Sequence, residues 1–285
     1  MLIDAHWGIN YICGSEFADI YEDIILMVRG ANPMKIGYQL YSALKKCGDA
    51  EGLKDVIRQI AEMGYDGVEF FNYAGIPAGE MKELLDSLGI TAINSHVYIP
   101  RWENNADLEI GYAVALGMKW ITIPYIPPEE RTEETYLKLC RNIPVWSKEC
   151  MNRGITLCYH NHDFEYTPYK EGLLLDRILE SSDDLMLEMD TFWVKYAGFD
   201  PISEMDKRRD RLPLIHIKDY LDLSCFPPAF TAIGTGHMEN GSIIRCAEDL
   251  GVEWVIVEQD NSPIDELESA RISIENIRKS ISGIN

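Results

Sequence analysis

Residues 157–165, LCYHNHDFE, contain the pattern that decides the fold: an apolar, strand-like run that ends in a metal-binding type of side chain. The pattern returns in LMLEMD (185–190), LPLIHIKD (212–219) and WVIVEQD (254–260). The side chains that end the four runs are His160, Asp190, His216 and Glu258. Their spacings of 30, 26 and 42 residues correspond to one or two strand–helix units.

Strand-like and helix-like segments alternate outward from these runs. Strands are expected at 35–41, 66–71, 90–99, 119–126, 155–162, 184–190, 211–219 and 252–260. Helices are expected at 51–64, 79–89, 105–117, 133–154, 172–182, 200–208, 240–251 and 264–281. The helical segments carry apolar residues at i, i+3 and i+4, and the strands are nearly continuous apolar runs, as in a sheet covered on both faces. Eight such units predict an α/β fold, a single-domain (β/α)8 TIM barrel over residues 34–285.

Residues 1–33 do not fit this repeat. Their one helical candidate is FADIYEDIILMVRG (17–30), and Met34 directly precedes the first strand. We therefore expect a short N-terminal appendage outside the barrel. An upstream start, a helix that covers the barrel bottom and a subunit contact are all left open.

The amino-acid composition limits the kinds of partner that the protein is expected to bind. The net charge of −21 argues against nucleic acid, because phosphate binding depends on Lys and Arg. The seven cysteines are odd in number and include no C-x-x-C, which favours reduced thiols. No apolar run is long enough to cross a membrane, and the N-terminus lacks the basic region of a secretory signal. We expect a cytoplasmic protein, with a homo-oligomer left open.

The four strand ends predict a metal site. In a parallel barrel the carboxyl ends of the strands converge on one mouth. Two imidazoles and two carboxylates that meet there form a set suited to Mn²⁺, Co²⁺ or Zn²⁺ more than to Mg²⁺. Lys218 alternates with His216 on one strand face, so both are expected to point into the barrel. Earlier strands add the inward candidates Gln39, Glu69, Asn94, His96 and Thr122.

Several of these residues also have a purely structural interpretation. Asp190 is placed to cap the segment that follows it, and Asp260 to cap the last helix. Trp193 suits a wall on which a sugar stacks and suits core packing equally well. Glu165 suits a solvated loop as well as a site.

The runs YHNHDFEY (159–166), MDTFWVKYAGFDP (189–201), LIHIKDY (214–220) and VEWVIVEQD (252–260) resemble the sugar phosphate isomerase/epimerase group, the xylose isomerase-like barrels. The resemblance spans about residues 34–280. It implies one divalent ion, held by Glu, Asp, His and Glu from four strand ends.

Asp190, His216 and Glu258 match three of these implied ligands, but the usual E-N-H motif reads His160-Asn161-His162. Three readings are open: His160 ligates directly, Glu165 reaches in, or the site binds metal weakly. The residues expected to contact substrate are His96, His162, Glu165, Trp193, Lys218 and Glu69.

The resulting prediction is a metal-dependent isomerase or epimerase, with Mn²⁺ as the first choice, that acts on a keto or aldo sugar. Glu258 or His160 would remove a proton next to the carbonyl and leave a metal-bound enediolate. The alternative is a lyase, dehydratase or deglycosidase that eliminates a β-substituent from a 3-keto-sugar or glycoside at the same site. A DNA-repair endonuclease is disfavoured by six His and the net charge of −21. A barrel without catalysis is kept because of His160.

Overall fold

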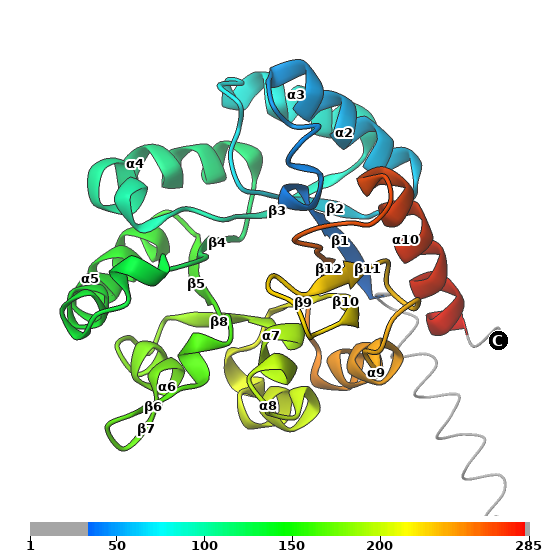
Figure 1. The fold of residues 1–285 in the computed structure, drawn as a ribbon. Coiled ribbons are helices and arrows are strands. Elements are labelled where there is room, and N and C mark those ends of the chain that lie inside the picture. The colour runs from blue at the N-terminus through cyan, green and yellow to red at the C-terminus, as the bar shows by residue number, and fades with distance from the viewer. Residues whose placement is uncertain (1–33, 283–285) are drawn as a thin grey trace, which may run out of the picture. The chain divides into compact units, whose positions relative to one another are not determined.

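A computed structural model describes residues 34–282, so the appendage predicted at residues 1–33 lies outside the described chain. Eight parallel strands form one curled sheet in the order β3-β2-β1-β12-β9-β8-β5-β4, and helices surround it (Figure 1). The strands are β1 (Lys35–Gln39), β2 (Gly67–Phe70), β3 (Thr91–Ser95), β4 (Trp120–Ile123), β5 (Thr156–His160), β8 (Met186–Asp190), β9 (Leu214–Ile217) and β12 (Trp254–Val257). The predicted (β/α)8 TIM barrel is confirmed.

The helices that follow the strands pack their apolar sides on the barrel. They are α2 (Ala50–Glu62), α3 (Ala78–Leu88), α4 (Ile99–Leu116), α5 (Glu133–Met151), α6 (Leu174–Leu179), α7 (Thr191–Tyr196), α8 (Pro201–Lys207), α9 (Asn240–Leu250) and α10 (Glu266–Ser282). In α2, Leu53, Ile57 and Ile60 are buried, as the i, i+3/i+4 spacing predicts. None of the described helices is both long enough and apolar enough to cross a bilayer.

The barrel is nearly closed where β3 and β4 meet. These two strands share one parallel bridge, between His96 and Thr122, and the Val97 amide donates to the Thr122 carbonyl at 2.8 Å. The bridge lies just past the end of β3. It therefore fixes the backbone of His96 at the mouth of the barrel.

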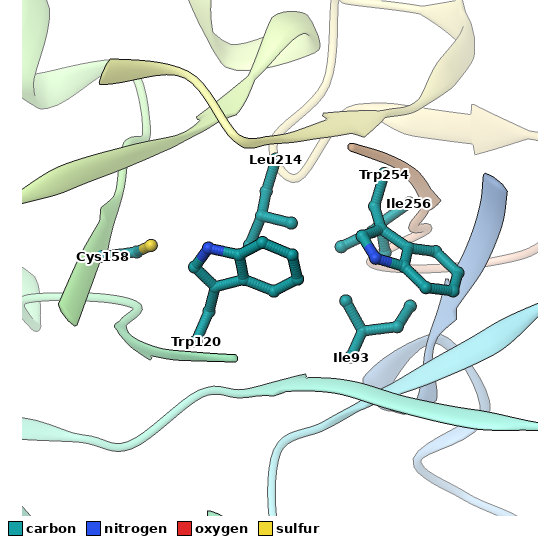
Figure 2. Packing of buried hydrophobic residues seen from close by; sticks show 6 residues of the cluster. All are labelled: Ile93, Trp120, Cys158, Leu214, Trp254 and Ile256. Atoms are coloured by element: carbon teal, nitrogen blue, oxygen red, sulfur yellow. The ribbon is translucent and has the colours of Figure 1, made fainter. Parts of the chain in front are cut away.

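The lower interior of the barrel is apolar, and we call it the floor. Figure 2 shows the six residues that define it, Ile93, Trp120, Cys158, Leu214, Trp254 and Ile256. Gly37 of β1 makes room for this cluster: a Cβ there would lie 2.3 Å from Ile93 Cδ1. A side chain at that position would force the floor to shift.

The structure departs from the predicted elements in the loops around the mouth. A short helix, α7, follows β8 directly, because the Asp190 side chain accepts the amides of Phe192 and Trp193. Two hairpins were not expected. The hairpin of β6 (Pro168–Tyr169) and β7 (Gly172–Leu173) precedes a shortened α6, and the hairpin of β10 (Asp219–Asp222) and β11 (Ala229–Thr231) occupies the long loop after β9.

Candidate active site

The four predicted strand-end residues converge at the mouth of the barrel. One ligand atom from each of His160, Asp190, His216 and Glu258 lies within 4.8 Å of the others, and all four side chains are buried. We call these residues the mouth quartet. Donor atoms about 2.0–2.2 Å from one ion lie up to about 4.4 Å apart, so a small contraction would bring the quartet to coordinating distance.

The two oxygens of Asp190 face different partners, and the predicted capping role is confirmed. Oδ1 accepts the amides of Phe192 at 2.9 Å and Trp193 at 3.0 Å, which caps α7. Oδ2 is buried, lies 3.2 Å from Lys218 Nζ, and accepts no hydrogen bond from the described residues. Burial raises the pKa of Asp190 to about 6, against the lowering effect of Lys218. The uncapped oxygen therefore faces the site, where the Lys218 ammonium is the cation next to it.

His160 is a neutral imidazole. Burial lowers its pKa to about 3, and the hydrogen bond from its ring to Glu188 does not offset this. Its Nε2 lies 3.8 Å from Asp190 Oδ2, and its Nδ1 lies 3.4 Å from Glu188 Oε2. A neutral imidazole is the form that binds a metal, so this side chain suits the position at which the resembled family carries a glutamate.

His216 lies between a carboxylate of the quartet and carboxylates below it. Its Nδ1 is 2.8 Å from Glu258 Oε2, and its Nε2 is 2.8 Å from Glu69 Oε2. Burial by itself would lower the pKa of His216, but Glu69, Glu188 and Glu258 together hold it well above the usual value. The ring is thus fixed in orientation from both sides.

Glu188 is the site residue that sequence reasoning missed. It is fully buried on β8, two residues before Asp190, and its Oε2 lies 2.7 Å from His96 Nε2. With His96, His160 and His216 it forms a second group of four donors within 4.8 Å of one another. The alternation of strand residues was the signal: the same parity that places Asp190 inside the barrel also places Glu188 there.

Glu69 lies below the quartet, not in the open mouth where it was expected to orient substrate. It is fully buried, and its oxygens accept Gln39 Nε2 at 2.5 Å and Asn94 Nδ2 at 2.8 Å. Burial and the charge of Glu188 raise its pKa to about 7. Glu69 and Glu188 therefore support the rings above them from within the barrel.

Lys218 balances charge beneath the mouth. Its Nζ lies 2.7 Å from Asp260 Oδ1, 3.1 Å from Glu258 Oε2 and 3.2 Å from Asp190 Oδ2. Burial opposes its charge, but these carboxylates hold its pKa well above the usual value. The expectation that Asp260 caps the last helix is wrong, because Asp260 pairs with Lys218 and Asp265 accepts the first amides of α10.

Glu165 does not reach the quartet. Its two oxygens accept the Tyr159 hydroxyl at 2.7 Å and the His162 amide at 2.8 Å. Tyr159 has the opposite strand parity to His160 and points out of the barrel interior. Glu165 therefore fixes the loop behind β5, and neither the predicted metal contact nor the predicted substrate contact appears in this arrangement.

A cavity of about 450 Å³ opens above the quartet. His96, His162 and Trp193 line it, as expected of substrate contacts, whereas Glu69, Glu165 and Lys218 do not. The other lining residues are Tyr41, Phe71, Tyr98, Pro124, Tyr125, Pro128, Arg131, His160, Asp163, Phe226, Pro227, Glu258 and Asp260. Trp193 also packs against Phe230, with 6.3 Å between ring centroids, so it is both a cavity wall and a core residue. This volume suits one sugar-sized molecule.

Comparison with known proteins agrees with this architecture. The model of the family described as xylose isomerase-like TIM barrel matches residues 57–280. Among curated proteins, inosose dehydratase of Geobacillus kaustophilus is 23% identical, with 83% of this chain and 91% of that protein covered.

Two solved structures share the fold. The sugar phosphate isomerase/epimerase of Parabacteroides distasonis has a TM-score of 0.70 at 20% identity and covers 86% of this chain and 93% of that one. The IolI protein with a bound zinc atom has a TM-score of 0.67 at 14% identity, over 88% of this chain and 99% of that one.

Proposed function

The chain belongs to the xylose isomerase-like TIM-barrel family, and on that premise we propose that it is a divalent-metal-dependent sugar isomerase or epimerase. Its substrate would be a keto or aldo sugar that loses a proton next to the carbonyl. The observation that carries the proposal is the mouth quartet, in which two imidazoles and two carboxylates meet at the base of a sugar-sized cavity.

The quartet fits a divalent ion on the chemistry of its donors, with His216 losing its proton when the ion binds. His160 is neutral, and Asp190 Oδ2 is a buried oxygen without a hydrogen bond. The mixed nitrogen and oxygen set suits Mn²⁺, Co²⁺ or Zn²⁺, and the related IolI structure contains zinc. When bound, the ion would act as a Lewis acid that polarises the substrate carbonyl and acidifies the adjacent C–H.

Glu258 is the base in this proposal. Burial opposes its ionisation, but Lys218 and His216 hold its pKa well below the usual value, so it is a carboxylate at neutral pH. Its Oε2 is the atom held by His216 and Lys218, which assigns the substrate proton to Oε1. Return of that proton to the neighbouring carbon gives isomerisation, whereas epimerisation requires a second acid that protonates the same carbon from the opposite face.

β-Elimination is the second candidate, and one observation favours it: the curated relative is a dehydratase. The first step is the same removal of a proton by Glu258. Instead of returning the proton to carbon, the site would break the β C–O bond while an acid protonates the leaving oxygen, which releases water or the aglycone as an alcohol. Product mass separates the two outcomes, because elimination gives a lighter product.

The test is incorporation of deuterium into a panel of keto-sugars and keto-glycosides in D₂O, with Mn²⁺ present and mass spectrometry as the readout. We expect Glu258→Gln to slow exchange by about 10²- to 10⁴-fold, the usual contribution of a general base. The matched control is Glu253→Gln, which removes an exposed carboxylate five residues earlier that pairs with Lys119.

Two results would contradict the proposal. One is exchange that survives Glu258→Gln at the wild-type rate. The other is the absence of exchange with every substrate in a protein shown by elemental analysis to contain the ion. A product lighter by one water or one aglycone would replace isomerisation with elimination and leave the role of Glu258 intact.

A further inference from the structure

Arg131 is a fixed cation in the wall of the cavity. It follows the short 3-10 helix Pro128–Glu130 after β4, and it is half-buried. Its Nε donates to the Ile126 carbonyl at 3.0 Å. The guanidinium carbon lies 3.8 Å from the centroid of the Phe164 ring. A hydrogen bond and a stacked ring thus hold the group in place before any ligand binds.

No carboxylate of the described residues pairs with Arg131, in contrast to Arg101 and Arg208. Arg101 binds both oxygens of Glu109, at 2.8 and 2.7 Å. Arg208 pairs with Glu204 and with Asp176. Arg131 Nη1 and Nη2 form no hydrogen bond with the described part of the chain. The half-buried guanidinium therefore keeps donors from which a ligand in the cavity can accept hydrogen bonds.

The other charges in the cavity wall do not satisfy it. Glu258 and Asp260 are paired with Lys218. Asp163 also lines the cavity, but no ion pair or hydrogen bond joins these two described residues. An anion carried by the substrate would give these donors a charged partner.

We propose that Arg131 binds a carboxylate of the substrate, so that the substrate of this site is a sugar acid, a polyhydroxy ketone with a carboxylate at the end distant from the reacting carbonyl. This inference rests on the proposed function, which assigns the reaction at the carbonyl end of the substrate. The planar fork of a guanidinium matches a carboxylate through two parallel hydrogen bonds. One cation in a cavity that also contains Asp163, Glu258 and Asp260 suits a monoanion better than a phosphate dianion.

The experiment compares three sugars that differ only at C6: D-fructose, D-fructuronate and D-fructose 6-phosphate. Binding to the Mn²⁺-loaded protein is measured by calorimetry and proton exchange by mass spectrometry in D₂O. We expect the uronate to bind tightest, and Arg131→Gln to weaken uronate binding by about 10- to 100-fold, as for a charged hydrogen bond. Fructose binding should change less than about twofold. Arg131→Lys should restore part of the loss, because it keeps the charge without the fork.

Two further variants separate the anchor from general electrostatics. Arg141→Gln removes an exposed arginine ten residues later on α5 and should leave uronate binding unchanged. Asp163→Asn removes a negative charge from the cavity wall and should strengthen uronate binding or leave it unchanged. If Asp163→Asn instead weakens it to the level of Arg131→Gln, the two residues act as a pair and the proposal is overturned.

Each remaining outcome is decisive. Equal loss of fructose and uronate binding in Arg131→Gln would overturn the inference, as would uronate binding that Arg131→Gln leaves intact. Tighter binding of the phosphate ester would overturn the carboxylate assignment. Uronate binding that depends on Arg131, without exchange of any proton, would support the anchor while it removes the proposed function. The two failures are therefore distinguishable.

Discussion

The floor and the mouth of the barrel are built from the same strands, yet one is apolar and the other is ionic. On β5, Cys158 lies in the floor and His160, two residues later, in the mouth. Leu214 and His216 repeat the step on β9, and Ile256 and Glu258 repeat it on β12. Two positions along the same strand therefore separate an apolar residue of the floor from a polar residue of the mouth.

The difference shows which part of the barrel stabilises the fold. Removal of apolar floor surface from water is favourable at about 25 cal/mol per Å². The mouth instead buries carboxylates whose mutual repulsion is relieved by Lys218 and protonated imidazoles. Buried ion pairs often contribute little net stability. The floor and helices should hold the fold, and the mouth should respond to ions and ligands.

The largest expected effect is on the floor. Trp254→Ala removes a ring that is 3% exposed and leaves a cavity between β12 and Ile93. We expect a loss of about 3–5 kcal/mol of unfolding free energy, measured by urea denaturation. The Kd for Mn²⁺ should change less than about twofold, because no mouth ligand is touched. The division between floor and mouth would be refuted if this variant kept the wild-type unfolding free energy. It would also be refuted if the Kd for Mn²⁺ weakened as much as it does when a residue of the quartet is replaced.

The next effect belongs to the quartet. At a concentration 100 times its Kd, Mn²⁺ should raise the unfolding free energy of the wild-type protein by about 2.7 kcal/mol, and EDTA should reverse this. Asp190→Asn should lose most of the shift, since it replaces the carboxylate oxygen that faces the site. Trp254→Phe, which keeps an aromatic floor, should retain the full shift. An undiminished shift in Asp190→Asn would place the ion elsewhere.

A smaller effect is expected one layer below the quartet. Glu188 accepts a hydrogen bond from His96, and its Oε2 lies 3.4 Å from the Nδ1 of His160 in the quartet. Loss of such a supporting carboxylate typically weakens metal affinity by about 10- to 100-fold. Glu188→Gln should show this weakening in a Mn²⁺ titration while one ion per chain is still bound. Unchanged affinity would mean that the rings are held by packing alone.

The sequence predicted the barrel well, because both of its signals are local and repeated. Apolar runs and helical spacing recur eight times, and each strand end is marked by its own polar residue. The loops were predicted less well. The helix after β8 is only six residues long and depends on one capping side chain, Asp190. The hairpin of β10 and β11 lacks the alternating apolar pattern on which strand prediction depends.

For the site, the sequence named every member of the quartet, and also Glu69, His96 and Lys218 around it, but it missed Glu188 and Arg131. Glu188 could have been found by the parity argument already applied to His216 and Lys218. Arg131 could not, because it lies on a loop after β4 where no periodicity predicts which way a side chain points. Glu165 looked like a candidate because it is near His160 in sequence, but the chain turns and directs it to Tyr159.

The last prediction concerns Glu165, a buried carboxylate that forms no ion pair with a described residue, in contrast to the paired carboxylates of the mouth. Burial raises its pKa from 4.5 to about 8, and the hydrogen bonds from Tyr159 and the His162 amide only partly oppose this. The folded protein therefore binds this proton more tightly than the unfolded chain does. Its stabilising contribution is complete below about pH 4.5 and is lost as the pH rises through about 8. Within that window stability should fall by up to about 1.4 kcal/mol per pH unit.

Glu165→Gln should flatten this part of the stability profile in urea denaturation from pH 5 to 8, and Glu83→Gln, an exposed control on α3, should not. A wild-type slope that persists in Glu165→Gln would assign the pH dependence to the ionic mouth instead.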